Sequence, residues 1–120
     1  MTLRRGQVWW WDCPPHNREN IQEGCRPVVI VSNDICNTNS PVITVVPLTT
    51  RVKHPYPQQV PLVLPNRVSI AIADQITSIP VSELRDFVCT LRDFQMEAVD
   101  RAIEVQLGLR DTVSYQFLGE

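Results

Sequence analysis

The chain has 120 residues, 43% of them hydrophobic and 20% charged, and a formal net charge of −2. This balance is typical of one compact globular domain, and it excludes extended disorder and binding of nucleic acid through overall basicity. No apolar stretch approaches the roughly 20 residues of a membrane-spanning helix, and the N-terminal segment lacks the apolar region of a signal peptide. We therefore expect one domain, residues 1–120, that stays in the cytoplasm away from membranes.

Ten prolines against four glycines, with several prolines between short Val- and Ile-rich runs, predict many short strands joined by stiff loops. The expected strands are 6–12, 26–33, 42–50, 58–64 and 69–79. In the first strand, alternation separates Trp10 from Trp9 and Trp11, so at least one of the three rings enters the core. In the second strand, the unbroken apolar run 28–31 predicts burial on both faces.

The hydrophobic period changes after Ser82, which is a favourable helix cap. One face of the predicted helix carries Phe94, Val99, Ile103 and Leu107, and less regularly Met96 and Ala102. Gly108 is suited to end this helix. The sequence thus predicts a mainly β fold with a C-terminal helix: a small barrel over about residues 3–80, a helix over about 91–108, and a tail without a pattern over 109–120.

Common cofactor and metal motifs are absent from the sequence. The four cysteines form no CxxC pair, and no phosphate-binding loop, HExxH or GxSxG motif occurs. We therefore expect neither a metal nor a cofactor. The remaining candidates for chemistry are arginines and hydroxyl groups at strand ends and in loops.

Four motifs follow one another along the chain: RRGQVWWWD at 4–12, QEGCRPVVIVSNDICN at 22–37, VVPLTT at 45–50 and SIAIADQITSI at 69–79. In order and spacing they resemble the MazF/PemK family of toxin endoribonucleases over about residues 3–109. The resemblance implies an SH3-like β-barrel of the CcdB/MazF type, a C-terminal helix and a homodimer. It also implies the toxin of a type II toxin–antitoxin system, which inhibits translation and growth by sequence-specific, metal-independent cleavage of single-stranded messenger RNA.

The resemblance places the family's catalytic pair at Arg26, in GCRPVV, and at Thr49, in VVPLTT. The alignment between them needs no gap, which favours Thr49 over Thr50. A guanidinium can donate two parallel hydrogen bonds to phosphate oxygens, and a hydroxyl can position a phosphate oxygen or the attacking 2′-OH. The expected products are a 2′,3′-cyclic phosphate and a 5′-hydroxyl. Arginine is a poor general base, so the part of Arg26 in proton transfer stays open.

Both residues also have an ordinary structural interpretation. Taken alone, Arg26 is a solvated charge at a strand end, and Thr49 is a β-branched strand residue that faces solvent. Their joint position in the motifs favours catalysis.

The RNA-binding candidates lie mostly in two segments that are otherwise a solvated loop and a Pro-rich connector. They are Arg18, Gln22, Thr50, Arg51, Lys53, His54, Tyr56 and Gln75. In the loop 19–25, Gln22 and Gly24 match the family, whereas Ile21 and Glu23 replace its usual glutamate and glycine. The RNA sequence that relatives recognise therefore does not transfer to this chain.

A groove lined by Arg26, Arg51 and Lys53 that accepts RNA would also accept an acidic, flexible segment of the cognate antitoxin. DNA would be contacted only indirectly, through the antitoxin. Two other functions are open at this point: a CcdB-like toxin that poisons gyrase without nuclease activity, and an inactive SH3-like interaction module. The GCRPVV and LTT elements favour cleavage.

Overall fold

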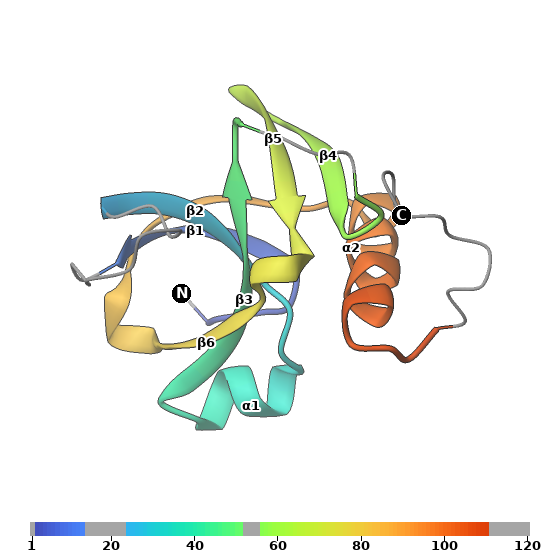
Figure 1. Ribbon diagram of the computed structural model, residues 1–120. Helices are drawn as coiled ribbons and strands as arrows, with labels where there is room; N and C mark the ends of the chain where they lie inside the picture. The colour runs from blue at the N-terminus through green and yellow to red at the C-terminus, as the bar shows by residue number, and fades with distance from the viewer. Residues whose placement is uncertain (1, 14–23, 52–55, 111–120) are drawn as a thin grey trace.

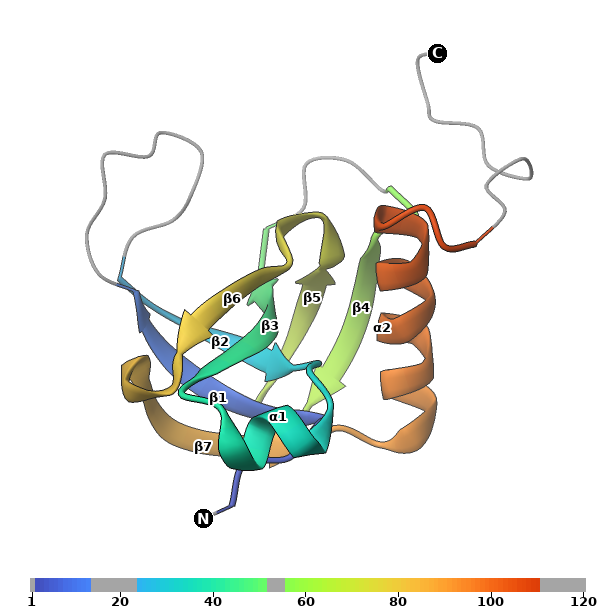
Figure 2. The same ribbon diagram turned by 90° about the horizontal axis from the view of Figure 1, so that it is seen from below.

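The computed structural model describes residues 2–13, 24–51 and 56–110 of the chain. Its elements follow in the order β1 (Gln7–Cys13), β2 (Gly24–Ile30), α1 (Asp34–Asn39), β3 (Val42–Thr49), β4 (Gln59–Leu64), β5 (Arg67–Ile72), η1 (Ala73–Gln75), β6 (Thr77–Pro80), η2 (Val81–Glu83), β7 (Leu84–Thr90) and α2 (Asp93–Gln106). The described strands curl into an antiparallel half-barrel, with α2 beside β4 (Figures 1 and 2). The predicted mainly β fold with a C-terminal helix is confirmed. No helix in these residues has the length and apolar character to cross a bilayer.

Strand β3 holds the curled sheet together. The strand order is β4-β5-β3-β2-β1-β7, and β6 also pairs with β3. The first half of β3 pairs with β6, whereas its last two residues, Leu48 and Thr49, pair with β5. Its other edge carries β2 over 45–47. One strand therefore belongs to both halves of the sheet.

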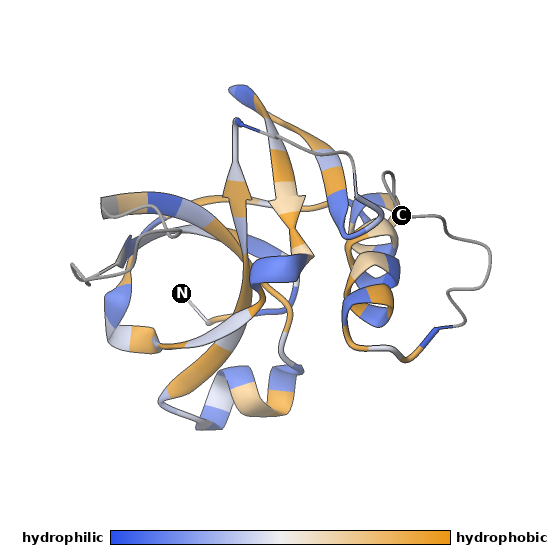
Figure 3. Cartoon of the chain, in the orientation of Figure 1, coloured by the Kyte–Doolittle hydropathy of each residue, from blue (hydrophilic) through white to orange (hydrophobic). Residues whose placement is uncertain are grey.

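The core lies on both faces of the central strands. Val28, Val29 and Ile30 are 0% exposed, which confirms the predicted burial of the second strand on both faces. One cluster, on the face toward α2, includes Val8, Val29, Val46, Leu48, Leu62 and Val99. The second cluster, which we call the inner cluster, is Trp11, Val28, Ile30, Ile43, Val45 and Ile79. Figure 3 shows hydrophobic stretches along these strands. Trp11 is the tryptophan ring that enters the core.

Two parts of the sheet differ from the prediction. The expected strand 69–79 is two strands, β5 and β6, separated by the 3-10 turn η1. Moreover, Ser82 does not cap a helix; it lies in η2, and strand β7 follows. The sheet therefore extends to Thr90, beyond the expected end of the barrel at about residue 80. Strand β7 escaped prediction because its side chains are mostly exposed and show no alternation.

Helix α1 was also missed. It begins at Asp34 because the side chain of Asn33, the residue before it, accepts a hydrogen bond from the backbone N–H of Cys36. The Asp34 carboxylate accepts from the backbone N–H of Arg5 and from the Asn37 side chain, and these bonds lower its pKa. The Arg5 guanidinium also pairs with Asp100 of α2. The N-terminus is thereby tied to both helices.

Helix α2 begins and ends inside the expected range, but two residues of its predicted apolar face were wrong. Phe94 is 66% exposed and Leu107 is 53% exposed. The buried residues are Gln95, Val99, Ala102 and Val105. The Gln95 side chain is buried because its amide donates to the backbone carbonyl of Val63 and its carbonyl caps the helix at the N–H of Arg92.

Gly108 ends α2 as predicted. It has a φ of +72°, its N–H donates to the carbonyl of Val105, and the N–H of Leu109 donates to that of Glu104. This is the Schellman arrangement, in which the residue after the helix adopts a left-handed conformation that glycine tolerates best.

We expect Gly108→Ala to lower the free energy of unfolding by about 1 kcal/mol, because a Cβ disfavours this conformation and meets nothing within 4 Å at this site. Gly6→Ala should cost more, since its φ is +92° and the new Cβ lies 3.3 Å from Cγ of Met96. Urea unfolding followed by circular dichroism measures both. Equal losses would contradict the packing contribution at Gly6.

Candidate active site

A row of paired residues crosses the sheet at the sequence-predicted catalytic arginine. In the antiparallel registers, Trp11 of β1 is paired with Leu84 of β7 on one side and with Arg26 of β2 on the other. The β2–β3 ladder ends at the pair Val28–Pro47. The same register, continued by two residues, would set Arg26 across from Thr49. The two residues are not partners in the ladder, however, because the start of β2 and the end of β3 diverge beyond the pair Val28–Pro47 (Figure 1).

Arg26 is buried rather than solvated. Its relative exposure is 6%, and its Nε and Nη1 atoms have almost no solvent-accessible surface. Pro27 follows it, which restricts Arg26 to extended backbone and fixes the direction of its side chain. Because β2 is an interior strand of the sheet, the interpretation of Arg26 as a solvated charge at a strand end was wrong.

Thr49 is the last residue of β3 and is half-buried. Its Oγ1 accepts a hydrogen bond from the backbone N–H of Arg51 at 3.2 Å. A hydroxyl that accepts at its oxygen can still donate its hydrogen. The oxygen is therefore fixed in place by the backbone, and the proton remains available to a ligand.

Alternation puts Arg26 and Thr49 on the same face of the sheet. Val28 and Ile30 follow Arg26 at every second position, Ile43 and Val45 precede Thr49 in the same way, and all four belong to the inner cluster. The two polar residues thus lie where the apolar inner face ends. A guanidinium and a hydroxyl on a common face can together hold a phosphate group.

The RNA-binding candidates are brought together only in part. Thr50 and Arg51 continue directly from Thr49 and are exposed. Tyr56 is half-buried, and its carbonyl accepts from the N–H of Gln59 at 3.0 Å. Gln75 is half-buried in η1, which contacts β3 and α2. Four further candidates, Arg18, Gln22, Lys53 and His54, lie outside the described residues.

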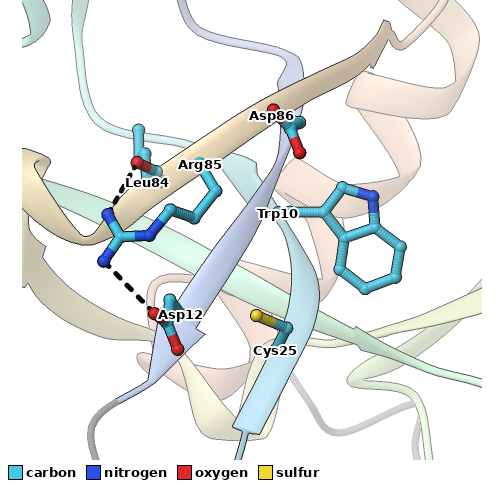
Figure 4. Close-up of a pocket in the computed structure, with 6 residues that line it drawn as sticks. All are labelled: Trp10, Asp12, Cys25, Leu84, Arg85 and Asp86. Carbon is cyan, nitrogen blue, oxygen red and sulfur yellow. Dashed lines mark hydrogen bonds and ion pairs between the residues drawn. The ribbon is translucent and has the colours of Figure 1, made fainter.

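The opposite face of β1 and β2 carries a different feature. A shallow pocket of about 550 Å³ is lined by Trp10, Asp12, Cys25, Leu84, Arg85 and Asp86 (Figure 4). Arg85 bridges to Asp12 at 3.2 Å, and Arg67 lies over the Trp10 ring at 5.7 Å from its centroid. Two carboxylates in this pocket disfavour a phosphate backbone, so we place the candidate active site on the face of Arg26 and Thr49.

The described part of the chain shows no cluster of metal ligands, and one of its cysteines is a partly buried thiol. Within that part of the chain, no three His, Cys, Asp or Glu side chains form a group that could hold a metal ion. Burial raises the pKa of the Cys89 thiol, which keeps it protonated and unreactive at neutral pH.

Comparison with known proteins identifies the family of the chain. Residues 4–107 match the model of the family described as "PemK-like, MazF-like toxin of type II toxin-antitoxin system". The chain belongs to the PemK/MazF family of toxins. Endoribonuclease MazF of Staphylococcus saprophyticus is 32% identical over 95% of this chain and 98% of that protein. Endoribonuclease EndoA of Bacillus subtilis is 33% identical over 92% of this chain and 99% of that protein.

A solved PemK/MazF relative has the same fold. It is an endoribonuclease from a mycobacterial species, solved in complex with its cognate antitoxin, with a TM-score of 0.77 and 26% identity over 91% of this chain and 98% of that chain. The family resemblance inferred from the four motifs is confirmed.

The sequence patterns missed one interaction at this site of the PemK/MazF chain. The indole Nε1 of Trp11 donates to Oε1 of Glu83 at 2.8 Å, which links the neighbour of Arg26 to η2. No periodic signal could have revealed it, because the two residues are 72 positions apart.

Proposed function

We propose that this chain is the toxin of a type II toxin–antitoxin system and that it cleaves single-stranded messenger RNA with Arg26 and Thr49 as its catalytic pair. The general activity follows from kinship: the chain is a MazF-type endoribonuclease, related over nearly its whole length to two endoribonucleases. Two observations support the site: the burial of the Arg26 guanidinium and the backbone hydrogen bond that fixes the Thr49 hydroxyl, on residues that alternation assigns to the same face of neighbouring strands.

The reaction needs no group beyond the RNA and the protein. The 2′-oxygen attacks the adjacent phosphorus and loses its proton, the bond from phosphorus to the 5′-oxygen breaks, and that oxygen gains a proton. The products are a 2′,3′-cyclic phosphate and a 5′-hydroxyl. Negative charge accumulates on the two non-bridging oxygens as the phosphorane forms, so donors aimed at these oxygens stabilise the transition state more than the substrate.

The two residues have separate roles in this scheme. The guanidinium of Arg26 donates to a non-bridging oxygen, and its burial makes each electrostatic interaction stronger than it is in water. The hydroxyl of Thr49 donates to a phosphate oxygen or holds the 2′-OH in line for attack. We assign charge stabilisation to Arg26 and not the proton transfers, because an arginine side chain keeps its proton at neutral pH and is a poor general base.

The remaining candidates extend the site along the RNA. Thr50 and Arg51 continue from Thr49 and would contact the neighbouring phosphates, while Tyr56 offers a ring for base stacking. The same basic surface would hold an acidic segment of the antitoxin, so RNA and antitoxin exclude each other. We further propose that residues 1–120 form one domain, that the toxin is a homodimer, and that it acts in the cytoplasm.

The decisive experiment incubates the purified protein, in EDTA, with a long single-stranded RNA and identifies the chemistry of the new ends. We expect metal-independent cuts at one short sequence, with 2′,3′-cyclic phosphate and 5′-hydroxyl ends, and their suppression by the antitoxin. If the protein leaves RNA intact but arrests growth by inhibiting gyrase, it is a gyrase poison. If it does neither, it is an interaction module.

A further inference from the structure

Trp11 and Glu83 form a chain of contacts that reaches Arg26. Three neighbouring parts of the fold contribute: Glu83 ends η2, Trp11 lies in β1, and Arg26 lies in β2. The indole of Trp11 donates to the Glu83 carboxylate at 2.8 Å, and Trp11 is the direct cross-strand partner of Arg26. Trp11 therefore stands between the carboxylate and the arginine.

The pairing places Trp11 and Arg26 side by side on one face. Directly opposite residues of an antiparallel pair have Cβ atoms about 4.5–5.5 Å apart and project to the same side of the sheet. Both are nearly fully buried, Trp11 at 7% and Arg26 at 6% exposure. The flexible arginine side chain thus extends beside a large, flat and rigid group that limits its rotamers.

Glu83 in turn fixes the orientation of the Trp11 ring. The terminal torsion of a tryptophan is broad, so packing alone leaves room for a ring flip. A buried indole N–H needs an acceptor, and only one ring orientation directs it at Glu83. Leu84 and Val81 lie on either side of Glu83 and pack against the same inner cluster. This packing holds in place the backbone that carries the Glu83 carboxylate.

We propose that Trp11 and Glu83 are positioning residues that hold the Arg26 guanidinium in line with the scissile phosphate. The proposal rests on the function proposed above, in which Arg26 stabilises the phosphorane. A guanidinium displaced by about 1 Å loses its hydrogen bonds to the phosphate in the transition state, and a misplacement of this size costs up to about 10²-fold in rate. The effect falls on kcat, because the substrate retains its other contacts.

The same strand supplies a matched control. Trp9 lies on the same face as Trp11, and its Nε1 also donates to a side-chain carbonyl, Oε1 of Gln7, at 3.0 Å. Its partner on β2 is Val28, however, and its ring packs edge-on against Phe87. Trp9 thus has the same hydrogen-bonding chemistry and a similar setting without being next to the arginine.

The test compares Trp11→Phe, Glu83→Ala, Glu83→Gln and Trp9→Phe by steady-state cleavage of a single-stranded RNA oligonucleotide that contains a mapped cut site. We expect Trp11→Phe and Glu83→Ala to lower kcat about tenfold, with KM changed less than about twofold. Glu83→Gln keeps an acceptor for the indole and should restore kcat to within about threefold of the wild type. Trp9→Phe should leave kcat and KM unchanged.

A double-variant measurement separates positioning from general loss of stability. If Glu83 acts through the fork of Arg26, then Glu83→Ala should have little further effect on kcat in an Arg26→Lys protein, which has no fork to misplace. A further tenfold loss in that protein, or an equal loss for Trp9→Phe and Trp11→Phe, would overturn the proposal. So would full kcat in Glu83→Ala while Arg26→Lys is impaired. Full activity of Arg26→Lys would instead refute the catalytic role proposed for the Arg26 guanidinium.

Discussion

Replacement of Arg26 by methionine is expected to lower kcat for RNA cleavage on the order of 10³-fold, because loss of a single preorganised donor to a developing oxyanion already costs about 10²–10³-fold. Methionine fills a similar volume without charge, so the buried site does not collapse. Arg26→Lys keeps the charge but loses the planar fork, and we expect its kcat to lie about 10²-fold below the wild type. Single-turnover cleavage of a labelled oligonucleotide measures both.

Arg85→Met is the matched control for Arg26→Met. Arg85 lies on β7, which β1 separates from the strand of Arg26, and it pairs with Asp12 and lines the pocket on the other face of the sheet. We expect its cleavage rate to stay within about twofold of the wild type, since an exposed ion pair contributes little to stability. Melting temperatures of all variants show whether the fold is intact. Comparable rates for Arg26→Met and Arg85→Met in folded proteins would exclude Arg26 from the chemistry.

Thr49→Val should lower kcat about 10²-fold, equivalent to about 3 kcal/mol of transition-state stabilisation. Valine keeps the β-branched shape that suits the strand end and removes only the hydroxyl. Thr49→Ser keeps the hydroxyl and should retain most of the activity. The product ends and the cut sequence should be unchanged in both variants, because the residue acts on the phosphate and not on a base.

Two other threonines of this region make the Thr49 assignment testable. Thr44 lies earlier on β3 and shares a hydrogen bond with Ser78 at 3.2 Å, so Thr44→Val controls for removing a hydroxyl from the same strand. Thr50 follows Thr49 and is exposed. We expect Thr50→Val to reduce kcat less than Thr49→Val does. The reverse order would shift the catalytic hydroxyl by one residue.

Elements with a regular pattern were predicted well, and elements without one were missed. The apolar run 28–31 predicted a strand buried on both faces, and its first three residues form a fully buried part of β2, whereas Val31 follows the end of that strand. Strand β7 was not predicted, because its exposed side chains carry no alternation and its ladder with β1 is broken by register shifts at Trp9. Helix α1 has six residues, too few for a helical period, and depends on the Asn33 cap. The break between β5 and β6 at 73–75 contains neither glycine nor proline, so it gave no signal.

The candidate site shows the same division. Motifs proposed Arg26 and Thr49 as the catalytic pair, and alternation along each strand predicts which residues share a face within that strand. Whether two strands turn the same face to a ligand depends on their register, which is set by the long-range pairs Val28–Pro47 and Leu48–Ala71. The burial of Arg26 and its link through Trp11 to Glu83 arise only when distant segments meet, so no local pattern predicts them.

Strand β3 belongs to both halves of the sheet, and this limits how the candidate site can change. Residue Val45 pairs with Ile30 on one edge and with Thr77 on the other, so neither half of the sheet can open without losing its central strand. The separation of Arg26 from Thr49 is therefore set by β2 and β3, two strands at the centre of the sheet that cannot move apart on their own. The segments 14–23 and 52–55, which carry most of the charged RNA-binding candidates, follow β1 and β3 in the sequence. We therefore expect substitutions in these two segments to alter which RNA is recognised and to leave the proposed catalytic pair in place.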